Sequence, residues 1–167
     1  MSKTITTVAI DPGLRGSGVA IFINGQLQSA YYVEVDEMRE RGPNVWRQSG
    51  AAVVASLTAA NTNVTTLVLE CPQVYPEHRS RSDDLIQLAG VVGSIATAVP
   101  ARRVVGLYPR EWTKRVPKEE RHARLKKQLQ PGEALRIQEA SWKSLTHNVL
   151  DAVGLGLYYV VENGERW

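Results

Sequence analysis

The 167-residue sequence contains little cysteine, histidine and phenylalanine, and it has no long hydrophobic run. Its single cysteine, Cys71, excludes a disulfide bond within the chain and is compatible with a reducing cytoplasm. No apolar run reaches the roughly 18 residues of a membrane span, and the first residues lack the apolar stretch of a secretory signal. Three histidines and one cysteine are too few to favour a tetrahedral zinc site. We expect a soluble protein with no membrane partner, folded as a single domain over residues 1–167.

Positive charge is unevenly distributed along the chain. Residues 101–145 contain twelve Lys and Arg but five Asp and Glu, a net charge of +7, whereas the remaining residues carry a net charge of −4. This segregation favours a polyanionic partner, most simply nucleic acid, although a solvated helical face is the alternative. The candidate phosphate-binding residues are Arg110, Lys114, Arg115, Lys118, Arg121, Arg124, Lys126 and Lys127. Trp112, within this segment, either contacts the DNA backbone or is buried and pins its helix to the sheet.

Apolar runs and turn residues predict an α/β fold. The expected elements are a strand over 4–10, two strands within 18–35, a helix over 45–60, a strand over 64–70, a helix over 83–98, a strand over 102–108, short helices broken at Pro117 and Pro131, and a long helix over 145–162. Asn24–Gly25, between the second and third strands, is typical of a tight hairpin turn because both residues tolerate positive φ. The order predicts a mixed five-stranded sheet, its first three strands antiparallel, flanked by helices.

Three acidic residues stand where a charge is costly to bury. Asp11 and Glu70 each directly follow an apolar strand, and Asp151 is the only charge inside an apolar helix. Ligands bind at the carboxyl ends of strands in open α/β sheets, so these acids meet there if the two strands are neighbours and the helix packs beside them. His147 and Asn148 precede Asp151 by four and three residues, which places them on the same helix face.

Clustered carboxylates repel one another, so one of them takes up a proton unless a cation compensates. Oxygen ligands with at most one imidazole suit Mg²⁺ or Mn²⁺, and two such ions support phosphodiester cleavage. We therefore predict a two-metal site formed by Asp11, Glu70 and Asp151, completed by His147 or Asn148. Each acid also has a simpler interpretation: Asp11 as a turn residue, Glu70 as the partner of an arginine, and Asp151 as the partner of the basic segment. A lone His147 is equally a packing residue at a helix start.

Four segments, in order over nearly the whole chain, carry a resemblance to a known family. "AIDPGLRGSGVAIF" contains Asp11, "LVLECPQVY" contains Glu70, and "HNVLDAVGLGLYY" contains the pair Asp151–Ala152. The fourth segment is "SDDLIQLAGVVGSI". Together they resemble RuvC-type Holliday junction resolvases of the RNase H-like superfamily, particularly the compact versions carried by bacteriophages.

The resemblance implies an RNase H-like fold and a homodimeric endonuclease that resolves four-way (Holliday) or other branched DNA junctions by paired symmetric nicks, leaving 5′-phosphate and 3′-hydroxyl ends. It implies catalytic roles for Asp11, Glu70 and Asp151, and a dimer interface on the helix of "SDDLIQLAGVVGSI". The cell would be a bacterium or a phage-infected host, and the protein cytoplasmic. The family places an acid or histidine three residues before the last aspartate. Here that residue is Asn148, with His147 one residue earlier.

The loop after Glu70 is expected to meet the centre of the junction. In this interpretation Tyr75 stacks on an exposed base, and Arg79 and Arg81 are candidates to meet the junction core. The alternative for Tyr75 is a loop residue packed on the domain. Two other functions stay open: another RNase H-like nuclease, acting on RNA–DNA hybrids or as an exonuclease, or a non-catalytic protein that binds branched DNA. Comparing the cleavage of a four-way junction, an RNA–DNA hybrid and a linear duplex would identify another nuclease. Cutting assays with and without EDTA would identify a non-catalytic binder.

Overall fold

The computed structural model describes residues 4–35, 42–74, 82–138 and 146–166. The elements are β1 (Thr6–Asp11), β2 (Gly16–Ile23), β3 (Gln26–Glu34), α1 (Pro43–Ala59), β4 (Thr66–Glu70), α2 (Ser82–Ala98), β5 (Arg103–Leu107), α3 (Pro109–Thr113), α4 (Lys118–Gln128), the 3₁₀ helix η2 (Ala134–Arg136) and α5 (Thr146–Glu162). The predicted break at Pro117 is confirmed, since this residue precedes the first residue of α4. Among the described helices, none is long and apolar enough to span a bilayer.

The five strands form one mixed sheet in the order β3-β2-β1-β4-β5. β2 is antiparallel to both β1 and β3, whereas β4 is parallel to both β1 and β5. The predicted sheet, with its first three strands antiparallel, is therefore confirmed. The turn between β2 and β3 has Asn24 at φ 48° and Gly25 at φ 77°, as the hairpin prediction requires.

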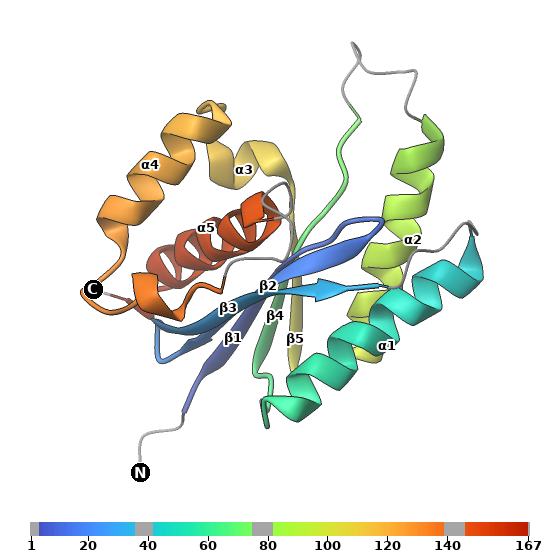
Figure 1. Ribbon diagram of the computed structural model, residues 1–167, viewed down its shortest axis with the longest axis horizontal. Coiled ribbons are helices and arrows are strands. Elements are labelled where there is room, and N and C mark those ends of the chain that lie inside the picture. The colour runs from blue at the N-terminus through green and yellow to red at the C-terminus, as the bar shows by residue number, and fades with distance from the viewer. Residues whose placement is uncertain (1–3, 36–41, 75–81, 139–145, 167) are drawn as a thin grey trace.

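Helices cover both faces of the sheet. In Figure 1, α3, α4 and α5 lie on one side of the sheet, and α1 and α2 lie on the other. Side chains alternate between the faces along each strand: Ala9 and Val68 belong to the apolar cluster of α5, and the residues on either side of them belong to that of α1 and α2. Asp11 and Glu70 lie two residues beyond Ala9 and Val68. The alternation therefore directs both acids toward α5.

Two glycines allow α5 to lie close against the sheet. A Cβ on Gly18 would be 2.0 Å from the backbone oxygen of Asn148, and a Cβ on Gly156 would be 2.2 Å from the ring of Phe22. Gly18 pairs with Asp11 across β1 and β2. The first turn of α5 is thus held beside the end of β1, which brings the following turn, with Asp151, to the same edge of the sheet.

Candidate active site

The three predicted acids come together at one edge of the sheet. The register of the parallel pair β1 and β4 matches Ile10 with Leu69, so Asp11 and Glu70 are the next residues of two neighbouring strands. Asp151, on α5, is 7% exposed. Each of the three lies close enough for its charge to act on another member of the cluster. The structure therefore brings the three acids near one another at this edge, and their role as metal ligands stays a prediction.

Burial and neighbouring charges disfavour the ionised forms of Asp11 and Glu70. Burial raises the pKa of Asp11 well above its usual value, and the charges of Glu70 and Asp151 raise it further. Burial also raises the pKa of Glu70, to about 7, although a hydrogen bond from Trp112 acts against this rise. Two basic residues of α4 lower the pKa of both acids, but their effect is smaller than that of burial. The positive charge of α4 therefore does not offset the rise in the pKa of Asp11 and of Glu70.

Three residues of α4 surround the Asp151 carboxylate. Lys118 Nζ lies 2.7 Å from Oδ2, whereas Arg121 Nη2 and His122 Nε2 lie 3.0 Å and 2.9 Å from Oδ1. The simpler interpretation of Asp151, as a partner of the basic segment, is therefore confirmed. His122 is absent from the predicted set. No local sequence signal points to it, because its partner Asp151 is 29 residues away in the sequence.

Trp112 joins the basic segment to Glu70. Its indole Nε1–H donates a hydrogen bond to Glu70 Oε2 at 2.7 Å, and the residue is 8% exposed. The guanidinium of Arg121 lies 4.7 Å from the centre of the Trp112 ring, within the range of a cation–π contact. Burial confirms the alternative in which Trp112 pins its helix to the sheet. The hydrogen bond adds a role at the site that the sequence pattern does not predict.

The two candidates for a fourth metal ligand, both on α5, differ in how far they are buried. Asn148 is half-buried against the turn after β1, where its Nδ2 is 3.3 Å from the position of a Cβ on Gly13. His147 is exposed. Within the described ranges, no three Asp, Glu, His or Cys side chains are arranged to hold a metal ion. The acids are thus gathered at one edge but are not closed around a common centre.

The predicted DNA contacts fall into three groups. Tyr75, Arg79 and Arg81 lie outside the described residues. Lys118 and Arg121 face Asp151. The exposed residues are Arg110, Lys114, Arg115, Arg124, Lys126 and Lys127. Arg110 lies on α3, Lys114 and Arg115 lie between α3 and α4, and the other three lie on α4.

Comparison with known proteins gives matches in structure but not in sequence. No family model matches the chain, and no curated protein matches it. Thermus thermophilus RuvC in complex with a Holliday junction substrate has a TM-score of 0.65 and 18% identity, covering 95% of this chain and 96% of that one. A second T. thermophilus RuvC structure has a TM-score of 0.62 and 16% identity, covering 96% and 98% of the two chains.

A third similar structure is the yeast mitochondrial Holliday junction resolvase Ydc2, with a TM-score of 0.60 and 8% identity. The match covers 95% of this chain and 80% of the yeast chain. Because these likenesses extend over nearly the whole chain, the protein has the fold of the RuvC structures.

Proposed function

We propose that the protein is a metal-dependent endonuclease that resolves four-way DNA junctions by paired symmetric nicks. The observation that carries the proposal is the convergence of Asp11, Glu70 and Asp151 at the carboxyl edge of the sheet. One of the similar structures is a RuvC bound to a Holliday junction substrate, which supports branched DNA as the substrate here. The exposed basic residues of α3 and α4 support a DNA partner independently.

The donor chemistry of the site suits hard divalent cations. Carboxylate oxygens are the ligands that Mg²⁺ and Mn²⁺ prefer. Burial and mutual repulsion raise the pKa of Asp11 and of Glu70, and a divalent cation would favour their ionised forms instead. Asp11, Glu70 and Asp151 would hold two ions, with Asn148 or His147 as a further ligand. When bound, the ions acidify the attacking water and stabilise charge on the leaving 3′ oxygen.

The chain's own residues position the carboxylates and the DNA. Trp112 holds one oxygen of Glu70 through its N–H, which restricts the orientation of that carboxylate. The exposed lysines and arginines of α3 and α4 bind phosphates without reading the sequence, and their binding weakens as salt is added. Arg121 and Lys118, next to Asp151, would contact the phosphates closest to the bond that is cut.

We also propose that the active form is a homodimer with α2 at its interface. α2 lies across the sheet from α3, α4 and α5 (Figure 1), so a partner bound there leaves the acids accessible. Ile86 on α2 is 60% exposed, as expected for an apolar residue that a partner covers. A two-fold axis would present two active sites to two strands of matching polarity, which explains how paired nicks arise.

One observation favours a second function, which is binding of branched DNA without cleavage. The Asp151 carboxylate contacts three side chains of α4, and no metal-holding group is assembled within the described parts of the chain. Cutting assays in Mg²⁺ and in EDTA separate the two functions. A non-catalytic protein would bind the junction equally in both and cut it in neither.

The test of the proposed function is the Asp11→Asn variant, assayed for binding and for cutting of a four-way junction. The amide keeps the shape of the side chain, so binding should stay within about twofold, whereas cutting should fall by more than about 100-fold because a metal ligand is lost. Glu162→Gln, an exposed charge change at the far end of α5, is the matched control.

Unchanged cutting by Asp11→Asn would remove Asp11 from the site. A linear duplex and an RNA–DNA hybrid serve as comparison substrates, and faster cutting of the hybrid would identify another nuclease of the same fold.

A further inference from the structure

The inner face of α4 is cationic where it meets the active site. This face contains Lys118, Arg121, His122 and Leu125, spaced three and four residues apart. Of these, only Leu125 is apolar, and it is 5% exposed within the apolar cluster of α5. The other three all contact Asp151. The N-terminal half of α4 is therefore held in place by one carboxylate rather than by an apolar face.

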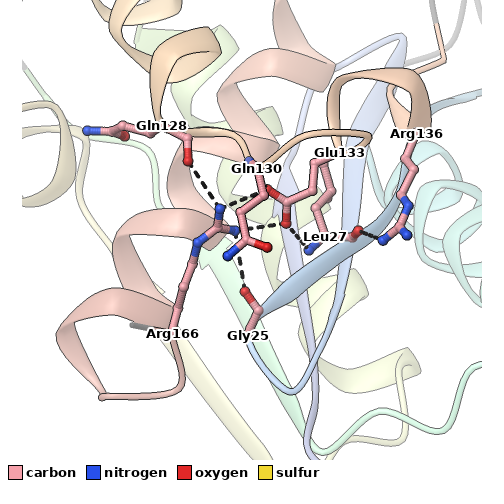
Figure 2. Close-up of polar contacts among 7 residues, drawn as sticks. All are labelled: Gly25, Leu27, Gln128, Gln130, Glu133, Arg136 and Arg166. Carbon is pink, nitrogen blue, oxygen red and sulfur yellow. Dashed lines mark hydrogen bonds and ion pairs between the residues drawn. The ribbon is translucent and has the colours of Figure 1, made fainter.

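The two ends of α4 are attached in different ways. At the C-terminal end, Arg166 donates to the backbone oxygen of Gln128 and forms a buried ion pair with Glu133 (Figure 2). At the N-terminal end, α4 follows Lys114 and Arg115, whose φ angles are 49° and 63°. Two consecutive residues other than glycine in the left-handed region are unfavourable. The linker before α4 is thus strained while the far end of the helix is firmly bound.

A cleft of about 580 Å³ lies between α4 and α5. Trp112, Leu125, Leu157 and Tyr158 are among the residues that line it. α4 therefore does not pack along α5 with a continuous apolar surface, as buried helices generally do. At its N-terminal half α4 meets α5 through Asp151, and Arg121 also stacks on Trp112.

The α4 contacts leave little capacity at Asp151 for a metal ion. A carboxylate offers about four lone-pair directions. Arg121 and His122 use two of them at Oδ1, and Lys118 uses a third at Oδ2. The positive charges of Lys118 and Arg121 would also repel a divalent cation. In the free protein, α4 and a metal ion therefore compete for the same carboxylate.

Arg121 has a donor that its present contacts do not use. Its Nε is buried and has no hydrogen-bond partner within the described residues. A buried donor without a partner is unfavourable, and an arginine can bind phosphate through two parallel N–H groups. A phosphate oxygen would thus satisfy more of the Arg121 donors than Asp151 does.

We infer that α4 covers the metal site in the free protein and that DNA removes this cover. Phosphates entering beside the acids would take Lys118 and Arg121 from Asp151, and the freed carboxylate would then bind metal. The inference rests on the proposed function, because it assigns a regulation to the same site. Its consequence is that DNA and metal bind cooperatively, each raising the affinity of the protein for the other.

The first experiment measures Mn²⁺ binding without DNA, by electron paramagnetic resonance, for the wild-type protein and for Lys118→Gln. Removing one competing cation should tighten Mn²⁺ binding by about threefold at low salt, and Lys118→Gln combined with Arg121→Gln should tighten it by about tenfold. Because the side chain of Lys118 is 40% exposed, its replacement should leave the fold intact, which circular dichroism verifies.

Lys127→Gln is the matched control. Lys127 is exposed and stands nine residues after Lys118, so it lies on the opposite face of the same helix. Lys127→Gln loses the same positive charge as Lys118→Gln, but Lys127 lies on the face away from Asp151. Its Mn²⁺ affinity should therefore change by less than about 1.5-fold.

The second experiment measures junction binding in EDTA for Asp151→Asn and Asp11→Asn. Both variants replace one carboxyl group of the same cluster by an amide, but only Asp151 contacts the cations of α4. Asp151→Asn should therefore bind the junction about threefold more tightly than Asp11→Asn, because it frees Lys118 and Arg121 for phosphate.

The outcomes distinguish the inferred covering of the metal site by α4 from the proposed nuclease function on which it rests. Equal Mn²⁺ affinity in wild type, Lys118→Gln and Lys127→Gln, or weaker binding in Lys118→Gln, would overturn the cover and leave the nuclease proposal standing. Equal junction affinity of Asp151→Asn and Asp11→Asn would do the same. Absence of Mn²⁺ binding in every variant, with no cutting by the wild type, would overturn both.

Discussion

Two buried acids, Glu133 and Asp151, hold opposite ends of α4, and they are bonded in different ways. Glu133 accepts hydrogen bonds from the backbone N–H groups of Leu27 and Gln130 and from both terminal nitrogens of Arg166 (Figure 2). The contacts of Asp151 with α4 come from three side chains, of which that of Lys118 is 40% exposed. Backbone donors cannot leave without unfolding the chain, whereas long cationic side chains can exchange a carboxylate for a phosphate. The contacts of Glu133 therefore form a fixed anchor, whereas the inferred opening of α4 would break only the contacts of Asp151.

The largest expected effect comes from breaking the Glu133 cluster. Glu133→Gln would leave Arg166 buried without a carboxylate, which should lower the free energy of unfolding by about 3–5 kcal/mol. Urea denaturation measures this loss. The matched control is Glu120→Gln, which removes an exposed pair with Arg124 on the surface of α4 and should cost less than about 0.5 kcal/mol. Equal losses in the two variants would show that the Glu133 cluster is not the structural anchor of α4.

A second prediction compares how the two ends of α4 respond to pH. In the metal-free protein the pKa of Glu70, beside Asp151, is raised from 4.5 to about 7. When the pKa of an acid is raised in the folded state, ionising that acid destabilises the folded protein. The melting temperature should therefore fall by a few degrees as the pH rises from 5 to 8. Glu70→Gln should reduce this fall, and the part that remains is expected from Asp11, whose pKa is also raised. A fall of the same size in that variant would contradict the assignment to Glu70.

Glu133 should behave in the opposite sense. Burial acts to raise the pKa of Glu133, but hydrogen bonds from Arg166 and from two backbone N–H groups lower it below its usual value overall. Its contribution to stability is therefore present above pH 4.5 and is lost as the pH falls below that value. The two acids thus reduce stability at opposite ends of the pH scale, and melting curves of Glu70→Gln and Glu133→Gln between pH 3 and pH 8 separate them.

The smallest predicted effect concerns Trp112, which connects α3 to the active-site acids. Trp112→Phe keeps an aromatic ring in the core but loses the N–H that binds Glu70 at 2.7 Å. Junction cutting should fall by about tenfold, while junction binding in EDTA should not change. Trp46→Phe is the matched control, because it loses a similar N–H bond, to Gln87, on the opposite face of the sheet. Equal loss of cutting in both variants would make the effect one of general stability.

Much of the fold could be predicted because it follows from local patterns. Apolar runs gave the strands, and the Asn24–Gly25 pair gave the hairpin with both residues at positive φ. Period-two alternation then directs Asp11 and Glu70 to the face that α5 covers. The meeting of these two acids with Asp151 could be predicted for the same reason, since each follows from where a regular element ends or turns.

The surroundings of the acids could not be predicted in the same way. The return of α4 onto Asp151 depends on how α4 and α5 pack, and no local pattern in the basic segment encodes that contact. His122 and the Trp112 hydrogen bond belong to this second category, because each depends on a partner at least 29 residues away in the sequence. Tyr75, Arg79 and Arg81 fall outside the described residues, so the predicted contact with the centre of the junction stays a prediction.

The most direct test of the central claim is to map the cuts that the wild-type protein makes in a four-way DNA junction, in Mg²⁺ and in EDTA. If Asp11, Glu70 and Asp151 form a two-metal nuclease site, the junction should be nicked at symmetric positions in two strands of matching polarity in Mg²⁺, and it should remain intact in EDTA. Binding of the junction in both conditions, with no cuts in either, would contradict the account.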